Sequence, residues 1–284
     1  MEVAQKTYIC CFWKTYNMRE IIVRTISGVL YISIVIFSMS TSHEWFMGLF
    51  FILGVITLSE FLKLVHLKSY LAYILLAAFM YFLSYSIFEL NAVYLFLILS
   101  CFVNLYLFKD LLWVSKIPMF EKKKYVAVIF YIISGFVFLT LIPFIDGVFT
   151  PKLIVSIFVL IWANDTFAYV VGKSIGKHKL LERISPKKTI EGFVGGLIGS
   201  VIASIVLCNY TTLFDLKIWI SLALIASVFG TIGDLIQSKF KRQAGVKDSG
   251  VLMPGHGGLY DRLDSIVYAG PFIFAFLEIV NYVS

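Results

Sequence analysis

Residues Ser238 to Asp264 read SKFKRQAGVKDSGVLMPGHGGLYDRLD and separate the last two apolar stretches of the chain. They contain five Lys/Arg, three Asp and one of four histidines, in a chain that is 60% hydrophobic and 14% charged. The stretch has neither a helical nor a strand period, and Gly255, Gly257 and Gly258 would loosen any regular element. It therefore predicts a folded polar loop that holds a polyanion.

The remainder of the chain is too apolar for a soluble globular protein. Its 284 residues include 27 Phe and 16 Tyr, and the mean hydropathy is +0.91, which indicates an integral membrane protein. The net charge of +7 would also suit nucleic acid, but basic residues that flank apolar segments are what membrane topology requires. We therefore expect contact with membrane lipid and no nucleic-acid partner.

Nine segments are long and apolar enough to cross the membrane as helices, which takes about 20 residues for a hydrocarbon core of roughly 30 Å. They are Ile21–Ser40, Trp45–Leu62, Tyr70–Phe88, Ala92–Phe108, Tyr125–Ile145, Leu153–Gly172, Gly192–Tyr210, Ile218–Gln237 and Ser265–Val283. We therefore predict an all-α polytopic membrane protein with one domain over residues 1–284. Residues 1–149 would form mainly structural spans, whereas polar motifs border every span of residues 150–284.

The distribution of basic residues predicts how these spans are oriented. Of the 24 Lys and Arg residues, 22 fall in the N-terminal arm and in alternate connections, and only Lys152 and Lys217 fall in the others. Positive charge near the ends of spans favours the cytoplasmic side. We therefore expect the N-terminus and the large basic loops in the cytoplasm and the C-terminus on the opposite side.

The first polar group inside a predicted span is Asn164-Asp165-Thr166, in the later half of Leu153–Gly172. At about 1.5 Å per residue, Asp165 would lie roughly 12 Å from the loop that begins at Lys173. An ionised carboxylate that faces lipid is costly, so we expect Asp165 to face the bundle interior and to have a partner. The alternative is a hydrogen bond between helices with no catalytic role.

The second polar group is Ser185-Pro186-Lys187-Lys188-Thr189, directly before the seventh predicted span. Thr189 is predicted to cap the helix that follows, whose free backbone N–H groups suit an anion. Lys187 and Lys188, with Ser185 and Thr189 beside them, would suit phosphate groups. Two lysines at the end of a span also serve as an ordinary topology signal, and this alternative stays open.

The third polar group contains carboxylates on both sides of the opening stretch. Asp234 lies near the end of the eighth predicted span, after Gly230 and Gly233, which would permit a close backbone approach. Asp261 and Asp264 start the ninth span, three residues apart and so on one helical face. Mg²⁺ typically takes one or two carboxylates and completes its shell with water and substrate phosphates. The group therefore predicts a site for a metal-bound polyphosphate.

Alternatives exist for some of these residues. Asp261 and Asp264 would also be favourable charges at a helix N-terminus, worth about 0.3 to 1 kcal/mol each, but this leaves Asp234 unexplained. His256, between two glycines, is interpreted as a base, a phosphate contact or a structural hydrogen-bonding residue.

Four motifs in the opening stretch together closely resemble the signature of phosphatidate cytidylyltransferases, also called CDP-diacylglycerol synthases. They are Ser238-x-Phe240-Lys241-Arg242, Lys247-Asp248-Ser249-Gly250, Pro254-Gly255-His256-Gly257-Gly258 and Asp261-Arg262-Leu263-Asp264. The resemblance continues upstream through Gly233-Asp234-Leu235 and the two other polar groups, and it covers roughly Leu153 to the C-terminus. Gln237 departs from it, because family members commonly have Glu there, so we assign no metal-binding role to this position.

The resemblance implies an enzyme that converts CTP and phosphatidate into CDP-diacylglycerol and pyrophosphate, with Mg²⁺ as cofactor and a second cation left open. It also implies a bacterial cytoplasmic (inner) membrane protein with its active site facing the cytoplasm, and a homodimer, although no interface motif demands one. The expected metal ligands are Asp234, Asp261 and Asp264. The residues expected to bind substrate are Ser185, Lys187, Lys188, Thr189, Ser238, Lys241, Arg242 and Arg262, with Asp165 orienting a lysine or binding a second cation. Lys247, Asp248 and His256 are expected in the catalytic set.

Two other functions fit parts of the pattern. A related CTP-dependent lipid kinase or transferase would use the same kind of site. A cation-coupled transporter would use Asp165 and Asp234 for its ion, but transporters often place broken helices in corresponding halves. Here the polar motifs crowd into one half, which argues against alternating access.

Overall fold

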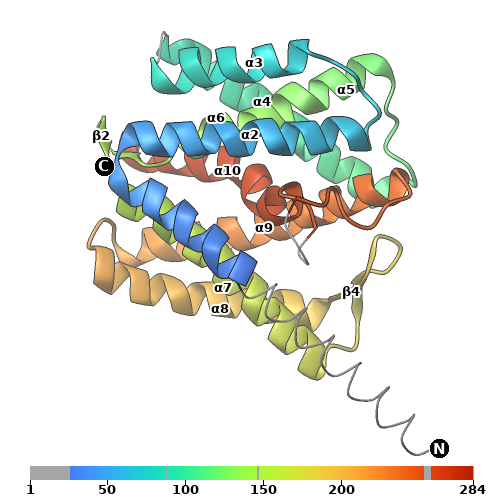
Figure 1. The fold of residues 1–284 in the computed structure, drawn as a ribbon. Helices are drawn as coiled ribbons and strands as arrows, with labels where there is room; N and C mark the ends of the chain where they lie inside the picture. Colours follow the sequence, from blue (N-terminus) through green and yellow to red (C-terminus); the bar gives the residue numbers. More distant parts are fainter. Residues whose placement is uncertain (1–25, 87–88, 146, 253–256, 284) are drawn as a thin grey trace, which may run out of the picture.

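The computed structural model describes residues 26–86, 89–145, 147–252 and 257–283, and most of them are helical (Figure 1). The predictions for the N-terminal arm and for His256 lie outside the described residues. After an apolar helix over Ile26–Thr41, the helical elements are α2 (His43–Leu64), α3 (Leu71–Phe79), η1 (Met80–Tyr85), α4 (Leu90–Trp113), α5 (Glu121–Ala127), η2 (Val128–Ile133), α6 (Ser134–Leu141), α7 (Pro151–Ile175), α8 (Ile190–Thr211), α9 (Leu216–Gln243) and α10 (Tyr260–Val283). The segments η1 and η2 are π-helical turns, and α5, η2 and α6 form one continuous helix.

Within the described residues, each apolar segment predicted from the sequence overlaps a helix. Seven helices of the described residues are long and apolar enough to cross a membrane, and the other two predicted spans match the shorter helices Ile26–Thr41 and Leu71–Tyr85. A helix suits such segments because it satisfies every backbone polar group internally. The all-α membrane class is therefore confirmed, while the number of crossings and the side of each terminus stay predictions.

The connection between α7 and α8 is more ordered than the sequence indicates. It contains an antiparallel hairpin of β3 (Lys179–Leu181) and β4 (Ser185–Thr189), in which Lys179 lies opposite Thr189. Thr189 Oγ1 accepts a hydrogen bond of 3.1 Å from Gly192 N, so the predicted cap of α8 is confirmed. A second short hairpin, β1 (Phe144–Ile145) and β2 (Val148–Phe149), precedes α7.

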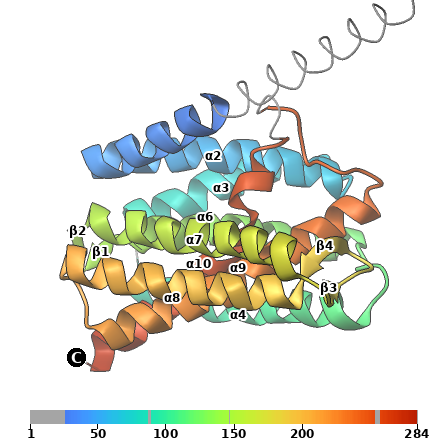
Figure 2. The same ribbon diagram turned by 90° about the horizontal axis from the view of Figure 1, so that it is seen from below.

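Helix α10 lies at the centre of the bundle, where it packs against α9, α6, α4 and α2 (Figure 1). Helices α7 and α8 run side by side as an outer pair, and both contact α9 (Figure 2). Buried aromatic rings join the two parts of the chain: Tyr131 from η2 and Tyr260 from α10 lie with their hydroxyl oxygens 2.7 Å apart. The start of α10 is thus fixed in the core.

Basic connections of the described chain meet at one end of the bundle. Lys124 Nζ donates to the carbonyl oxygen of His66 (3.3 Å), and Arg183 Nη2 donates to that of Val114 (3.2 Å). Lys239 Nζ, which is buried, also donates to Val114 O, at 2.5 Å. These contacts agree with the prediction that the lysine-rich connections share one side of the membrane.

Candidate active site

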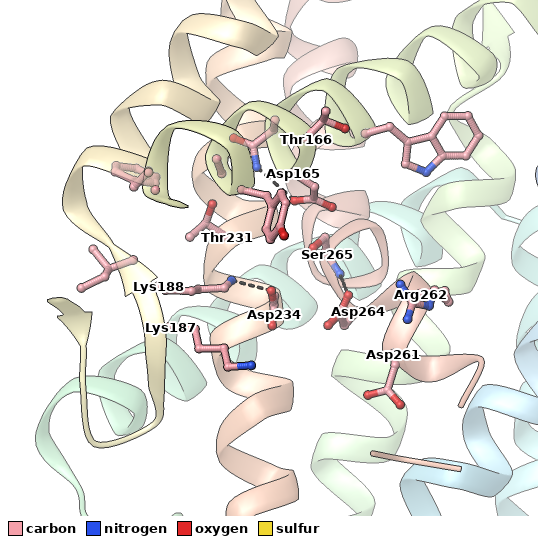
Figure 3. A pocket seen from close by; sticks show the side chains of 18 of the residues that line it. Asp165, Thr166, Lys187, Lys188, Thr231, Asp234, Asp261, Arg262, Asp264 and Ser265 are labelled. Carbon is pink, nitrogen blue, oxygen red and sulfur yellow. Dashed lines mark hydrogen bonds and ion pairs between the residues drawn. The ribbon is translucent and has the colours of Figure 1, made fainter. Parts of the chain in front are cut away.

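A cavity of about 1080 Å³ opens between α7, α8, α9, α10, the β3–β4 hairpin and the Ile26–Thr41 helix (Figure 3). Its lining residues lie toward the C-terminal ends of α7 and α9 and the N-terminal ends of α8 and α10. The cavity is therefore at one end of the bundle. The charged side chains that line it are Asp165, Lys173, Lys179, Lys187, Lys188, Asp234, Lys241, Asp248, Asp261, Arg262 and Asp264.

Asp234 forms an ion pair with the hairpin. Lys188 Nζ lies 2.5 Å from Asp234 Oδ2, and both side chains are partly accessible, at 28% and 32% exposure. Ser238 Oγ, one turn further along α9, donates to Asp234 Oδ1 at 3.2 Å. Partial burial lowers the pKa of Lys188, but the Asp234 carboxylate outweighs it and holds that pKa above its ordinary value. Lys188 is therefore a cation at neutral pH.

A close approach of α9 and α10 brings a second carboxylate to the same space. A Cβ atom on Gly233 would lie 2.7 Å from the carbonyl oxygen of Asp264, so only glycine fits there. Asp264 is 8% exposed, and its Oδ1 accepts a hydrogen bond of 2.8 Å from Ser265 N. Asp234, Asp264 and Asp165 lie around one space in Figure 3, and all three line the cavity.

Asp261 has a different environment from Asp234, because protein donors surround both of its oxygens and its side chain is only 8% exposed. Its Oδ1 accepts from Lys241 Nζ (2.7 Å) and Gln237 Nε2 (3.0 Å). Its Oδ2 accepts from Gly258 N (2.9 Å) and Ser249 N (2.9 Å), and Ser249 Oγ, whose single proton is closer to Glu60, lies 3.0 Å away. A carboxylate offers about four lone-pair sites, so Asp261 is saturated in this arrangement.

The donor set fits a hard cation that shares its shell with a substrate. Among the described residues, no group of three or more His, Cys, Asp or Glu is placed to hold a metal by itself. Mg²⁺ usually needs only one or two carboxylates beside water and phosphate oxygens. Asp234 and Asp264 offer such oxygens at the cavity, and Asp165, which accepts from Asn164 Nδ2 at 3.3 Å, lies beside them.

The structure brings most of the predicted site residues together and separates a few. Those that line the cavity are Asp165, Lys187, Lys188, Thr189, Asp234, Lys241, Asp248, Asp261, Arg262 and Asp264. Ser185 lies on β4 and Ser238 beneath Asp234, outside the lining, while Arg242 and Lys247 are exposed beyond it. Arg242 Nη1 donates to the carbonyl oxygen of Val246 at 3.3 Å, close to the end of its own helix.

Residues that were not predicted from the sequence also line the cavity or contact its surroundings. Lys173 and Lys179 add positive charge to the cavity, and Tyr31 and Trp162 add aromatic walls. Glu60 of α2 does not line the cavity, but it is buried and accepts hydrogen bonds from the polar loop. A glutamate inside an apolar span is a costly residue, and this was the signal in the sequence that could have identified it.

Comparison with known proteins gives one family. The chain matches the Cytidylyltransferase family over residues 22–280. It is 52% identical to a phosphatidate cytidylyltransferase of Staphylococcus haemolyticus (strain JCSC1435) over 118 residues, or 41% of this chain and 45% of the relative. Over the same shares it is 50% identical to a phosphatidate cytidylyltransferase of Staphylococcus aureus (strain COL). The aligned stretch thus spans less than half the length of these curated relatives.

Proposed function

The chain belongs to the cytidylyltransferase family, and from this premise we propose that it transfers the cytidylyl group of CTP to phosphatidate, giving CDP-diacylglycerol and pyrophosphate. The observation that carries the proposal is the cavity itself. It combines carboxylates of α7, α9 and α10 with lysines of the hairpin and of α9, inside a bundle of apolar helices. A water-soluble triphosphate and a membrane-anchored phosphate need a meeting place of this kind.

The lining of the cavity suits both substrates. Lys187, Lys188 and Lys241 would neutralise phosphate charge, and Arg262 at the start of α10 would add a planar, bidentate donor. Apolar residues line it as well, among them Ile32 and Trp162, and they would face the lipid portion of phosphatidate. The grouping of basic connections at this end of the bundle supports a cavity that faces the cytoplasm.

The ion pairs of the cavity indicate how it would receive a metal-bound nucleotide. Lys188 and Lys241 are paired with Asp234 and Asp261. On binding of CTP, both lysines would exchange their carboxylate partners for phosphate oxygens. Asp234 and Asp264 would then hold Mg²⁺, together with Asp261 Oδ1 once Lys241 has left it. When bound, Mg²⁺ would neutralise part of the triphosphate charge and fix its orientation.

The reaction that follows from this arrangement is a single in-line displacement. A phosphate oxygen of phosphatidate forms a bond to the α-phosphorus of CTP, while the bond from that phosphorus to the oxygen bridging it to the β-phosphate breaks. Pyrophosphate leaves with the electron pair of the broken bond. Such chemistry depends mainly on positioning and charge neutralisation, so no covalent nucleophile of the protein is required. Asp165 would orient Lys188 or bind a second cation.

One assay tests the proposal against its alternatives. Purified protein in detergent is incubated with phosphatidate, Mg²⁺ and CTP labelled either in the base or in the γ-phosphate, and the lipids are then separated. Base label in the lipid supports cytidylyl transfer. Only γ-phosphate label in the lipid would identify a lipid kinase, and label in neither position would leave a cation-coupled transporter as the better explanation.

A further inference from the structure

Glu60 links the first half of the chain to the polar loop between α9 and α10. It lies one turn before the end of α2, and the residue is 5% exposed. Its Oε1 accepts a hydrogen bond from Leu259 N (3.0 Å) and its Oε2 one from Tyr260 N (2.9 Å). Ser249 Oγ donates to Oε2 as well, at 2.7 Å. These contacts connect residues about 190 to 200 positions apart in the sequence.

The position of these donors gives Glu60 a defined task. Helix α10 begins at Tyr260, so the N–H groups of Leu259 and Tyr260 belong to the end of the helix that lacks partners within it. A carboxylate is favoured at that end by the helix dipole as well as by the hydrogen bonds. Glu60 therefore caps α10 from another helix, which compensates the cost of placing its charge in the core.

Two glycines of the polar loop are explained by the same contact. A Cβ atom on Gly250 would overlap Glu60 Oε1, and one on Gly258 would overlap Glu60 Oε2 and Ser249 Oγ. The loop passes so close to the carboxylate that no larger residue fits at either position. The loop backbone is thus shaped around Glu60.

The cap is connected to the cavity through two short paths. Ser249 Oγ lies within hydrogen-bonding distance of Asp261 Oδ2 as well as of Glu60 Oε2. Asp261, Arg262 and Asp264 all stand on the first turns of α10, directly after the capped N–H groups. A change at Glu60 would therefore move three charged side chains of the cavity, although Glu60 itself does not line it.

We infer that Glu60 is a positioning residue for cytidylyl transfer: it holds the start of α10 and the polar loop so that Asp261, Arg262 and Asp264 face the substrates. The inference rests on the proposed function for its kinetic consequence, but the structural part of it stands on the hydrogen bonds alone. It also assigns a role in the site to residues 1–149, which the sequence indicated to be mainly structural.

The test compares Glu60→Gln with Glu44→Gln, an exposed glutamate at the opposite end of the same helix. Hydrogen exchange in detergent reads the amides of Leu259 and Tyr260 from overlapping peptides. We expect Glu60→Gln to accelerate their exchange at least about tenfold through local opening, with no change in α8. Glu44→Gln should exchange as the wild type does. Unchanged exchange in Glu60→Gln would overturn the inference whatever the activity.

Kinetics separate a positioning role from general loss of structure. Activity is expressed per folded protein, with the folded fraction taken from a thermal melt. We expect Glu60→Gln to lower kcat for cytidylyl transfer by about 100-fold, the cost of a displacement of roughly 1 Å, while KM for CTP changes less than about threefold. Faster exchange with wild-type kcat would overturn the positioning role.

Two further results separate the role of Glu60 from a failure to fold and from a failure of the proposed function. If Glu60→Gln does not fold, Ser249→Ala removes one of the three partners of Glu60, and the exchange of Leu259 and Tyr260 is the criterion, because Ser249 Oγ also lies beside Asp261 and its kcat would report on both carboxylates. Faster exchange of the two amides supports the inference, and unchanged exchange would overturn it. If the wild-type protein transfers no cytidylyl label, the proposed function fails, and the exchange data alone decide whether Glu60 holds the start of α10.

Discussion

Asp234 and Asp261 both line one cavity, yet their surroundings differ. Asp234 is 32% exposed and pairs with Lys188, a residue of a surface hairpin, whereas Asp261 is 8% exposed and accepts hydrogen bonds from four protein N–H donors. We therefore expect that Asp234 can exchange its partner with little effect on the fold. Asp261 also holds the polar loop in place through its hydrogen bonds. Two residues with one predicted role are therefore expected to contribute differently to stability.

The largest effect is expected for Asp234→Asn. Removal of this charge should lower kcat for cytidylyl transfer by about 100- to 1000-fold, the usual cost of losing a charge-stabilising group. The melting temperature should stay close to that of the wild type, because the side chain is partly exposed and its partner can be solvated. Asp215→Asn, at the exposed start of the same helix, is the control. Near wild-type turnover would remove Asp234 from the catalytic set.

Lys188→Met tests the lysine of the Lys188–Asp234 ion pair, and Lys187→Met, a change at the neighbouring residue, is the comparison. Lys188 faces Asp234, and we expect its loss to reduce kcat/KM about 100-fold, since a charge-assisted contact of about 1.5 to 3 kcal/mol is removed. Lys187 is exposed at the cavity and makes no ion pair with any other described residue, so its loss should cost about tenfold or less, chiefly in KM. Equal effects of the two changes would contradict the ion-pair exchange that we propose.

Asp261→Asn is expected to lower the stability of the protein more than Asp234→Asn does. An amide in place of the carboxylate would turn an NH₂ group toward one of the surrounding donors, and the loss should be about 2 kcal/mol. For a chain of this size that corresponds to a melting temperature lower by roughly 3 °C or more. Activity should fall as well. A melting temperature equal to that of Asp234→Asn would show that the four N–H donors do not distinguish the two carboxylates.

The smallest effects are expected beyond the cavity. Arg242 and Lys247 are exposed and outside its lining, so Arg242→Gln and Lys247→Gln should each change kcat/KM by about fivefold or less, the range of exposed charge contacts. Steady-state kinetics with CTP as the varied substrate measures this. A loss above 100-fold would show that the polar loop carries these cations onto the phosphates, as the family resemblance implies.

Much of the fold follows from local features of the sequence. Apolar length alone identifies the helical segments, Thr189 is recognisable as a cap, and Gly233 indicates the close approach of α9 to α10. The β3–β4 hairpin could not be predicted, because its strands are polar and short and show no alternating pattern.

The distinction between the carboxylates needed the three-dimensional structure. Asp261 receives donors from α9 and from the loop before it, and Glu60 meets α10 from 200 residues away. Nothing in the local sequence of either residue encodes such partners. Sequence patterns therefore predicted most of the charged residues that line the cavity, but not which of them are held by hydrogen bonds from the protein.

We propose above that the cavity around Asp234 transfers a cytidylyl group to phosphatidate. The most direct test of this proposal measures base label entering the lipid and pyrophosphate released, for wild-type protein and for Asp234→Asn at equal folded concentration. We expect one pyrophosphate released for each base label that enters the lipid in the wild type, and a loss of both in the variant. Lipid labelled only from the γ-phosphate, no transfer by the wild type, or equal transfer by the two proteins would contradict it.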